Sequence, residues 1–260
     1  MIELNGRPVS LEELQTLALT NYGHFTSVRC DDGTVRGLTL HMERLVRDCR
    51  VVFGTDLDPE LVLSYVRQAT RERTGSFTVR VTVFDPALEV GHPGADAHPQ
   101  ILVTSRPTGA MPPPPLRART FTFSRDTALV KHVGLFGQLK LRREAQAAGF
   151  DDAVFVETDE RVSEGATWNL GFVDETGTVV WPDAPVLPGI TMQLLQEAHE
   201  QTVTAPVTLK ELPRMRAAFA TNTSVGVRAI NAIDATEFAT NDPVLEKLRK
   251  VYSALPGEHL

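Results

Sequence analysis

Lys131 is the residue of this 260-residue chain whose type and neighbours most directly suggest covalent chemistry. Only five of the 26 basic residues are lysine, and Lys131 is the first of them, between Val130 and an apolar run that contains glycine. A lysine, unlike an arginine, can lose its proton and condense with an aldehyde as a Schiff base. The alternative interpretation is a lysine at the start of a helix that extends its charge into solvent.

Glu164 is a second candidate, in the stretch "RVSEGATWN". We expect it between two strands, next to Gly165 and Ala166, where the backbone can be approached closely. A carboxylate in such a place could keep a pyridine nitrogen protonated, so that the ring can accept electrons. A solvated carboxylate in a turn is the alternative.

Two further stretches carry groups that suit a phosphate. In "VLPGITMQLLQEA", Thr191 lies at the expected start of a helix, where free backbone N–H groups and a hydroxyl form an anion cradle. A threonine that only caps its helix is the alternative. The stretch "ATNTSVGV" places three hydroxyls within four residues ahead of an expected strand, although a polar turn would look the same.

Composition and motif searches exclude several other functions. The formal charge of −7 and a pI near 5.5 argue against nucleic acid or an anionic membrane as a partner. No run of 18 apolar residues and no basic, apolar leader is present, so we expect neither a membrane span nor a signal peptide. Two cysteines do not make a disulfide framework, which favours a cytoplasmic location. GxGxxG, GxxxxGK[ST], GxSxG, CxxC and HExxH are all absent, so neither a nucleotide nor a metal is expected.

The elements that must position these residues follow an α+β pattern. Hydrophobic periodicity and caps predict helices over 11–19, 38–54, 58–73, 134–149, 191–201 and 243–255. Strands are predicted over 23–30, 76–84, 100–107, 119–124, 151–158, 169–182 (with a turn inside it) and 225–234. A proline-rich stretch separates two expected domains, so that the domain boundaries are 1–110, a linker at 111–117, and 118–260.

Five ordered motifs resemble one enzyme family. They are "LHMERL" with Arg44, "AQAAGFDDA" after Lys131, "VSEGATWN" with Glu164 and Asn169, "LPGIT" with Thr191, and the Asn222-Thr223 turn ahead of Ile233-Asp234. In this order they resemble the class IV (fold-type IV) pyridoxal-phosphate aminotransferases. That group includes branched-chain and D-amino-acid aminotransferases, (R)-amine transaminases and aminodeoxychorismate lyases. The resemblance covers residues from about 20 to 240.

The resemblance implies a fold, a cofactor and a set of roles. The fold would be α/β, with a small N-terminal α/β domain and a larger, β-barrel-like C-terminal domain with helices. The cofactor would be pyridoxal 5'-phosphate, with Lys131 as its Schiff-base lysine and Glu164 at its pyridine nitrogen. The implied phosphate ligands are Arg44, Ile190 (backbone), Thr191, Asn222 and Thr223. The enzyme would move an amino group between an amino acid or amine and a 2-oxo acid, and would be a homodimer.

Some positions depart from the family pattern and leave the substrate open. His132 follows the lysine where many members have Asn or Tyr, and Met192 replaces the usual Arg after "LPGIT". Thr26 in "GHFTSVR" resembles the "FTT" strand of aminodeoxychorismate lyases, in which the threonine would be a catalytic residue that helps proton transfer. A pyruvate-releasing lyase that forms 4-aminobenzoate is therefore the alternative function. A non-catalytic binding or scaffold protein is a third reading, against which the intact Lys131 and Glu164 count.

Overall fold

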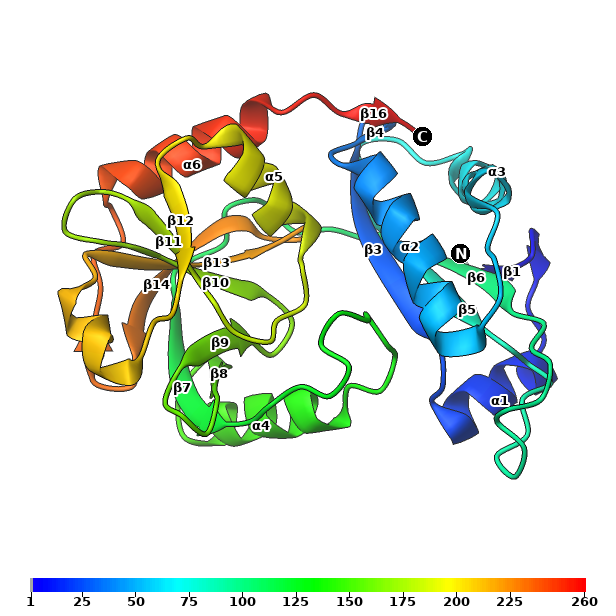
Figure 1. Ribbon diagram of the computed structural model, residues 1–260. Helices are drawn as coiled ribbons and strands as arrows, with labels where there is room; N and C mark the ends of the chain where they lie inside the picture. The colour runs from blue at the N-terminus through cyan, green and yellow to red at the C-terminus, as the bar shows by residue number, and fades with distance from the viewer. Residues whose placement is uncertain (1) are drawn as a thin grey trace. The chain divides into compact units, whose positions relative to one another are not determined.

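The computed structural model describes residues 2–260, which divide into two compact units (Figure 1). Unit 1 contains the chain up to Thr108 together with Val130–Gly134 and Pro256–Leu260, and unit 2 contains Gly109–Leu129 and Leu135–Leu255. This division differs from the expected boundaries because two short segments that follow Thr108 in the sequence pack with unit 1. The expected linker also ends inside a strand, since β7 begins at Leu116.

Unit 1 is built on a seven-stranded sheet. In spatial order its strands are β16 (Glu258–His259), β4 (Thr34–Val35), β3 (His24–Asp31), β5 (Ser76–Phe84), β6 (Gln100–Pro107), β1 (Ile2–Leu4) and β2 (Arg7–Pro8). The three long strands, β3, β5 and β6, are antiparallel neighbours with a continuous register. Their alternating side chains give the sheet two chemically different faces.

One face of this sheet is apolar and is covered by two helices (Figure 1). These are α2 (Leu38–Phe53), which packs on β3, and α3 (Pro59–Thr70), which packs on β6. Valines at every second position of β5 and the buried side chains of both helices form the core. Helix α1 (Leu11–Thr20) begins with a capping box formed by Ser10 and Glu13, and it packs with Phe84 and Leu102. Their parity along β5 and β6 puts these two residues on the opposite face.

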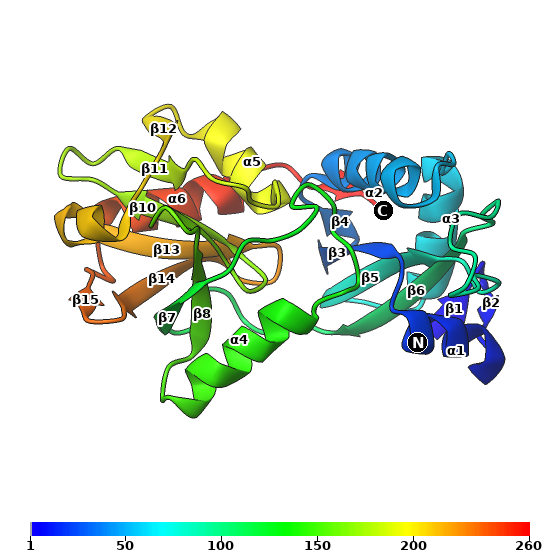
Figure 2. The same ribbon diagram turned by 60° about the horizontal axis from the view of Figure 1, so that its bottom comes forward.

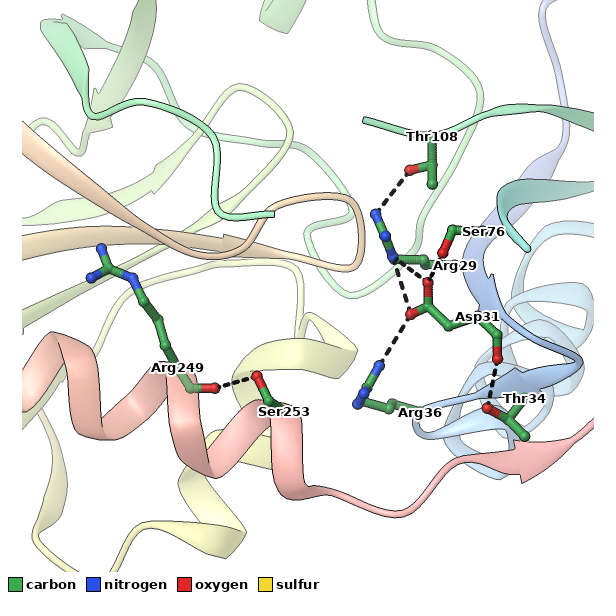
Figure 3. A network of polar contacts seen from close by, with 8 residues as sticks. All are labelled: Arg29, Asp31, Thr34, Arg36, Ser76, Thr108, Arg249 and Ser253. Atoms are coloured by element: carbon green, nitrogen blue, oxygen red, sulfur yellow. Dashed lines mark hydrogen bonds and ion pairs between the residues drawn. The ribbon is translucent and has the colours of Figure 1, made fainter. Parts of the chain in front are cut away.

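That opposite face is polar near the end of β3. The Asp31 carboxylate accepts hydrogen bonds from Nε of Arg29 at 2.9 and 3.1 Å, from Arg36 at 3.2 Å and from the Ser76 hydroxyl at 2.5 Å (Figure 3). Arg29 also donates to the Thr108 hydroxyl at 3.2 Å. These bonds join the end of β3, the start of β5 and the residue after β6. They therefore hold together the neighbouring strand ends at the point where the chain leaves unit 1.

Unit 2 contains a nine-stranded sheet whose centre closes on itself. The strands are β7 (Leu116–Thr122), β8 (Asp152–Val156), β9 (Val162–Gly165), β10 (Asn169–Val173), β11 (Val179–Pro182), β12 (Thr202–Ala205), β13 (Ala217–Asn222), β14 (Gly226–Ile233) and β15 (Thr236–Glu237). The pairing of β9 with β10 closes the ring β10-β13-β14-β7-β8-β9. This confirms the expected β-barrel-like domain, and a closed ring leaves its members without free edges.

Helices pack on the outside of unit 2. Helix α4 (Phe136–Ala147) lies along β7 and β8 (Figure 2), whereas α5 (Ile190–Ala198) and α6 (Pro243–Ala254) lie side by side and contact β13 and β14. A 3-10 segment, η1 (Leu209–Arg214), follows β12. Among the described residues, no helix is long and apolar enough to cross a membrane.

Several expectations for the elements need correction. Glu164 lies within the short strand β9 and not in a loop between strands. The stretch "ATNTSVGV", expected ahead of a strand, begins inside β13, so that Asn222 ends a strand and the turn follows it. The expected helix over 191–201 begins one residue earlier and ends at Ala198.

Candidate active site

Lys131 lies in a short segment of unit 1 that pairs with the start of β3. The Phe25 N–H donates to the carbonyl of Lys131 at 2.9 Å, and the Val133 N–H donates to the carbonyl of Gly23 at 2.9 Å. The Lys131 N–H donates to Oδ2 of Asp48, a fully buried residue of α2, at 2.9 Å. The backbone of Lys131 is therefore fixed on both sides, and its Nζ lies 4.8 Å from the centre of the Phe25 ring.

Thr26 and Arg44 meet in the interior of unit 1. Arg44 Nη2 donates to Oγ1 of Thr26 at 2.6 Å, and Oγ1 also lies 2.7 Å from Nδ1 of His41. All three side chains are buried, with 5% of Arg44 and none of the other two exposed. Burial, assisted by the positive charges of Arg44 and Lys131, holds the pKa of His41 well below its usual value.

Arg80 was not singled out from the sequence. Its guanidinium stacks on the Phe25 ring at 3.6 Å from the ring centre, and its Nε donates to Thr82 at 3.1 Å. Burial, with the charge of Arg106, lowers the pKa of Arg80. Within residues 2–260, no carboxylate forms an ion pair with it. The period-two alternation of β5 could have indicated Arg80, because it places an arginine among valines and threonines on a strand.

Glu164 is the central carboxylate of unit 2 and only 4% of it is exposed. Its Oε2 accepts a hydrogen bond from the Leu187 N–H at 3.2 Å, and its Oε1 lies 3.4 Å from Nη1 of Arg125. Burial of a carboxylate is tolerated where it is paired and hydrogen-bonded, and these contacts meet that condition. The sequence does not indicate Arg125, because its contact with Glu164 joins residues 39 positions apart.

The loop after Glu164 is held by a second buried carboxylate. Asp152 accepts hydrogen bonds from Nε1 of Trp168 at 2.8 Å and from Arg142 at 2.9 and 2.8 Å. The indole of Trp168 lies so close to Gly165 that a Cβ there would overlap it. Asp152 therefore fixes the indole, and the indole restricts position 165 to glycine beside Glu164.

The predicted phosphate residues of unit 2 lie around Asn169. Asn169 pairs with Glu164 on one side and with Thr221 on the other, and its Nδ2 donates to the carbonyl of Leu187 at 2.7 Å. Helix α5 begins at Ile190 without a side-chain cap, with Gly189 at its N-cap and Thr191 buried at its second position.

Asn222 and Thr223 complete this group. Nδ2 of Asn222 donates to the carbonyl of Thr167 at 3.1 Å, while Oδ1 accepts from the N–H groups of Ser224 and Val225. Thr223 is partly buried in the turn so formed. The neighbouring Thr221 has a buried hydroxyl with no hydrogen-bond partner, which is costly unless a ligand supplies one.

The residues present fit a phosphorylated pyridine aldehyde. In unit 1, Thr26 and Arg44 are hydrogen-bonded to each other, and Nζ of Lys131 lies on the ring of Phe25, the residue next to Thr26. Unit 2 brings together Glu164, Ile190, Thr191, Asn222 and Thr223. The donor set consists of an amine, a guanidinium, hydroxyls and uncapped helix N–H groups, which are the partners that an aldehyde and a phosphate need. In the part of the chain that the structure describes, no group of three or more His, Cys, Asp or Glu is arranged to hold a metal ion.

Comparison with solved structures shows the same fold in several aminotransferases. A branched-chain aminotransferase of Thermoproteus uzoniensis is 21% identical, with a TM-score of 0.86 over 97% of this chain and 93% of that one. The Escherichia coli branched-chain aminotransferase is 20% identical, with a TM-score of 0.85 over 98% and 93%. A hypothetical aminotransferase of Mycobacterium tuberculosis in its PLP-bound form is 17% identical, with a TM-score of 0.83 over 98% of both chains.

At these identities the structural likeness concerns the fold alone. No curated protein sequence matches the chain. The family profile described as "Amino-transferase class IV" matches residues 23–233, which span every residue of the two groups above. The chain belongs to the class IV aminotransferase family.

Proposed function

We propose that this protein is an aminotransferase that moves an amino group between an amino acid or amine and a 2-oxo acid, with Lys131 as its reactive amine. Class IV aminotransferases depend on pyridoxal 5'-phosphate (PLP), so the chain is a PLP-dependent enzyme by family. The observation that carries the residue assignment is the anchoring of Lys131. Both of its backbone groups are bonded, to Phe25 and Asp48, while its amine extends along an aromatic ring.

PLP, when bound, supplies an aldehyde that condenses with amines and a ring that withdraws electrons. The amine of Lys131, once free, would carry the proton that leaves and returns at the substrate α-carbon. The carboxylate of Glu164 would hold the proton on the pyridine nitrogen. The contact of Glu164 with Arg125 favours the ionised carboxylate that this role needs.

Each unit contains groups that suit a phosphate. Arg44 would supply the guanidinium, and the start of α5 would supply the Ile190 N–H and the Thr191 hydroxyl. The Asn222-Thr223 turn and the unpartnered hydroxyl of Thr221 support a further contact. Anions bind well at such a combination of helix N-terminus, hydroxyl and arginine.

Arg80 would bind a carboxylate of the amino acid or 2-oxo acid. It shares the Phe25 ring with the amine of Lys131 and has no carboxylate partner within residues 2–260. A partly buried guanidinium without an anionic partner is costly, and a substrate carboxylate would offset that cost.

We also propose that the enzyme is a cytoplasmic homodimer. The support is the family resemblance together with the two cysteines, Cys30 and Cys49, which are both free and buried. The lyase alternative is not better supported by the family or by the structural neighbours.

Reduction of the PLP-bound protein with borohydride tests the role of Lys131. We expect a stable adduct on the peptide that contains Lys131, and transamination of amino donors with a 2-oxo acid by the unreduced enzyme. Lys131→Arg should fold but lose both, whereas the exposed Lys140→Arg should keep both. An adduct on another lysine, or activity that survives in Lys131→Arg, would refute the assignment.

A further inference from the structure

The Thr26 hydroxyl lies between two buried groups of α2, and their chemistry fixes where its proton points. Arg44 Nη2 is 2.6 Å from Oγ1 of Thr26, and Nδ1 of His41 is 2.7 Å from the same oxygen. A guanidinium only donates hydrogen bonds, so Thr26 accepts from Arg44. Whether the proton of the hydroxyl points to His41 then depends on the tautomer of that ring.

The ring of His41 is in the state that accepts a hydrogen bond from the Thr26 hydroxyl. Burial and the charges of Arg44 and Lys131 keep its pKa low, so the ring is neutral. Nη2 of Arg44 is also 3.4 Å from Nδ1, and a proton on Nδ1 would therefore face a cationic N–H group. The neutral ring must then carry its proton on Nε2, with Nδ1 as the acceptor. Nε2 is buried without a hydrogen-bond partner, so no other contact selects the opposite tautomer.

The strand separates this group from the reactive amine. Phe25 and Thr26 are consecutive residues of β3, so their side chains point to opposite faces of the sheet. Nζ of Lys131 and the guanidinium of Arg80 lie on the Phe25 ring. Thr26 instead points to α2, where His41 and Arg44 stand three residues apart on one helix face.

We propose that Thr26 and His41 are positioning residues that orient the guanidinium of Arg44 through a directed chain, Arg44 to Thr26 to His41. The Thr26 hydroxyl then does not donate a proton to the substrate, because that proton is already bonded to His41. The proposal rests on the proposed function, in which Arg44 binds the cofactor phosphate. It gives Thr26 a role in cofactor affinity rather than in the proton transfer that its resemblance to the lyase strand suggests.

Variants of the two positions test the chain of hydrogen bonds. Thr26→Val keeps the shape and removes the hydroxyl, and His41→Leu removes the acceptor. Each should raise the dissociation constant for PLP by about tenfold. Thr26→Val removes the hydrogen bond from the charged Arg44, and His41→Leu removes the acceptor that orients the Thr26 hydroxyl toward it. Thr26→Ser and His41→Asn retain a hydroxyl and an acceptor, so they should retain most of the affinity. Thr70→Val is the matched control, because Thr70 is a buried threonine of α3 whose hydroxyl donates to the carbonyl of Val66 at 2.7 Å.

Turnover at saturating PLP separates positioning from chemistry. We expect Thr26→Val to lose less than about threefold in kcat there, whereas loss of a proton donor would cost about a hundredfold. The double variant Thr26→Val/Arg44→Ala should bind PLP no more weakly than Arg44→Ala alone, because Thr26 acts through Arg44. An additive double variant, an unaltered affinity in Thr26→Val, or a hundredfold loss of kcat would each overturn the proposal.

The tautomer can be measured in the wild-type protein without any substitution. Nitrogen-15 NMR of the imidazole should show His41 neutral, with its proton on Nε2. A proton on Nδ1 would overturn the directed chain. Failure of the wild-type protein to bind PLP would instead refute the proposed function, so the two failures are distinguishable.

Discussion

Lys131 and Arg80 contact the same aromatic ring, yet they differ in what holds them. Lys131 is fixed through its backbone, whereas Arg80 is held by stacking and by one bond to Thr82. Arg80→Gln should raise KM for amino acids by about tenfold to a hundredfold, because a charge-assisted contact to the carboxylate is lost. Amine donors that have no carboxylate should be unaffected. Steady-state kinetics with both donor classes measure this, and Arg67→Gln, on the exposed side of α3, is the control.

Glu164 should affect chemistry more than cofactor binding. In Glu164→Gln the amide oxygen still accepts from the Leu187 N–H. The neutral amide no longer supplies the negative charge that stabilises a protonated pyridine nitrogen. We expect kcat to fall by about a hundredfold with PLP still bound. Single-turnover spectra would check both points, with the exposed Glu175→Gln as the reference. Full activity in Glu164→Gln would remove this residue from the mechanism.

His24 should make the stability of the protein sensitive to acid. It is fully buried, neither ring nitrogen has a hydrogen-bond partner, and burial lowers its pKa from 6.5 to about 3. Between these two values the unfolded chain takes up a proton that the folded one does not. Stability is therefore complete above the unfolded pKa and falls as the pH is lowered toward the folded one.

Denaturant unfolding at several pH values tests this contribution. In His24→Phe the slope of the unfolding free energy against pH should become smaller across that window. The exposed His92→Gln should leave the slope unaltered. An equal slope in wild type and His24→Phe would show that His24 is not the group responsible.

At the scale of elements, the sequence predicted helices and their caps better than short strands. The box at Ser10 and the left-handed Gly54 at the end of α2 depend only on local residues, and both are present. Strand β9 is four residues long and β13 is alanine-rich, so neither has a clear period-two pattern. Both are strands because the ring of unit 2 pairs them, a non-local cause that single-sequence patterns do not contain.

The residues of the candidate site also differ in whether the sequence could predict them. Residues that belong to contiguous motifs, such as Glu164 and Thr191, could be named from the sequence. Their partners could not, because contacts such as Arg125 with Glu164 depend on strand register and on closure of the ring. The contact of His41 with Thr26 likewise requires α2 to cover the apolar face of the unit 1 sheet.

Gly189, the N-cap of helix α5, packs closely against Asn169. A Cβ at this position would overlap Oδ1 of Asn169, which also holds Leu187 through Nδ2. Gly189→Ala should therefore displace the start of α5 and cost about 1–3 kcal/mol of unfolding free energy, as overpacking usually does. PLP affinity should fall with it. Gly94→Ala, which has open space around it, is the control, and an unaltered stability in Gly189→Ala would contradict the close packing.

At the scale of the whole molecule, the chain leaves unit 1 at Thr108 and returns to it twice. One return is Val130–Gly134 and the other is Pro256–Leu260. The second pairs β16 with β4, and the Leu260 N–H donates to the carbonyl of Gly33 at 3.0 Å. The first carries Lys131. Unit 1 thus obtains Lys131, the proposed reactive amine, from a segment that is distant in sequence from the rest of its sheet.

Asp48 anchors the segment Val130–Gly134 to helix α2. Its Oδ2 accepts from the Lys131 N–H at 2.9 Å, while its Oδ1 accepts from Arg47 at 2.7 and 3.0 Å, and the carboxylate is fully buried. Asp48→Ala leaves the Lys131 N–H without this acceptor, so we expect a loss of about 2–4 kcal/mol in unfolding free energy. Amide exchange at 130–134 should speed up, and kcat should fall because the amine is less well placed. Asp56→Ala removes an exposed ion pair with Arg50 and should cost less than about 1 kcal/mol. If exchange at 130–134 is equally slow in Asp48→Ala and wild type, strand pairing with β3 alone holds the lysine.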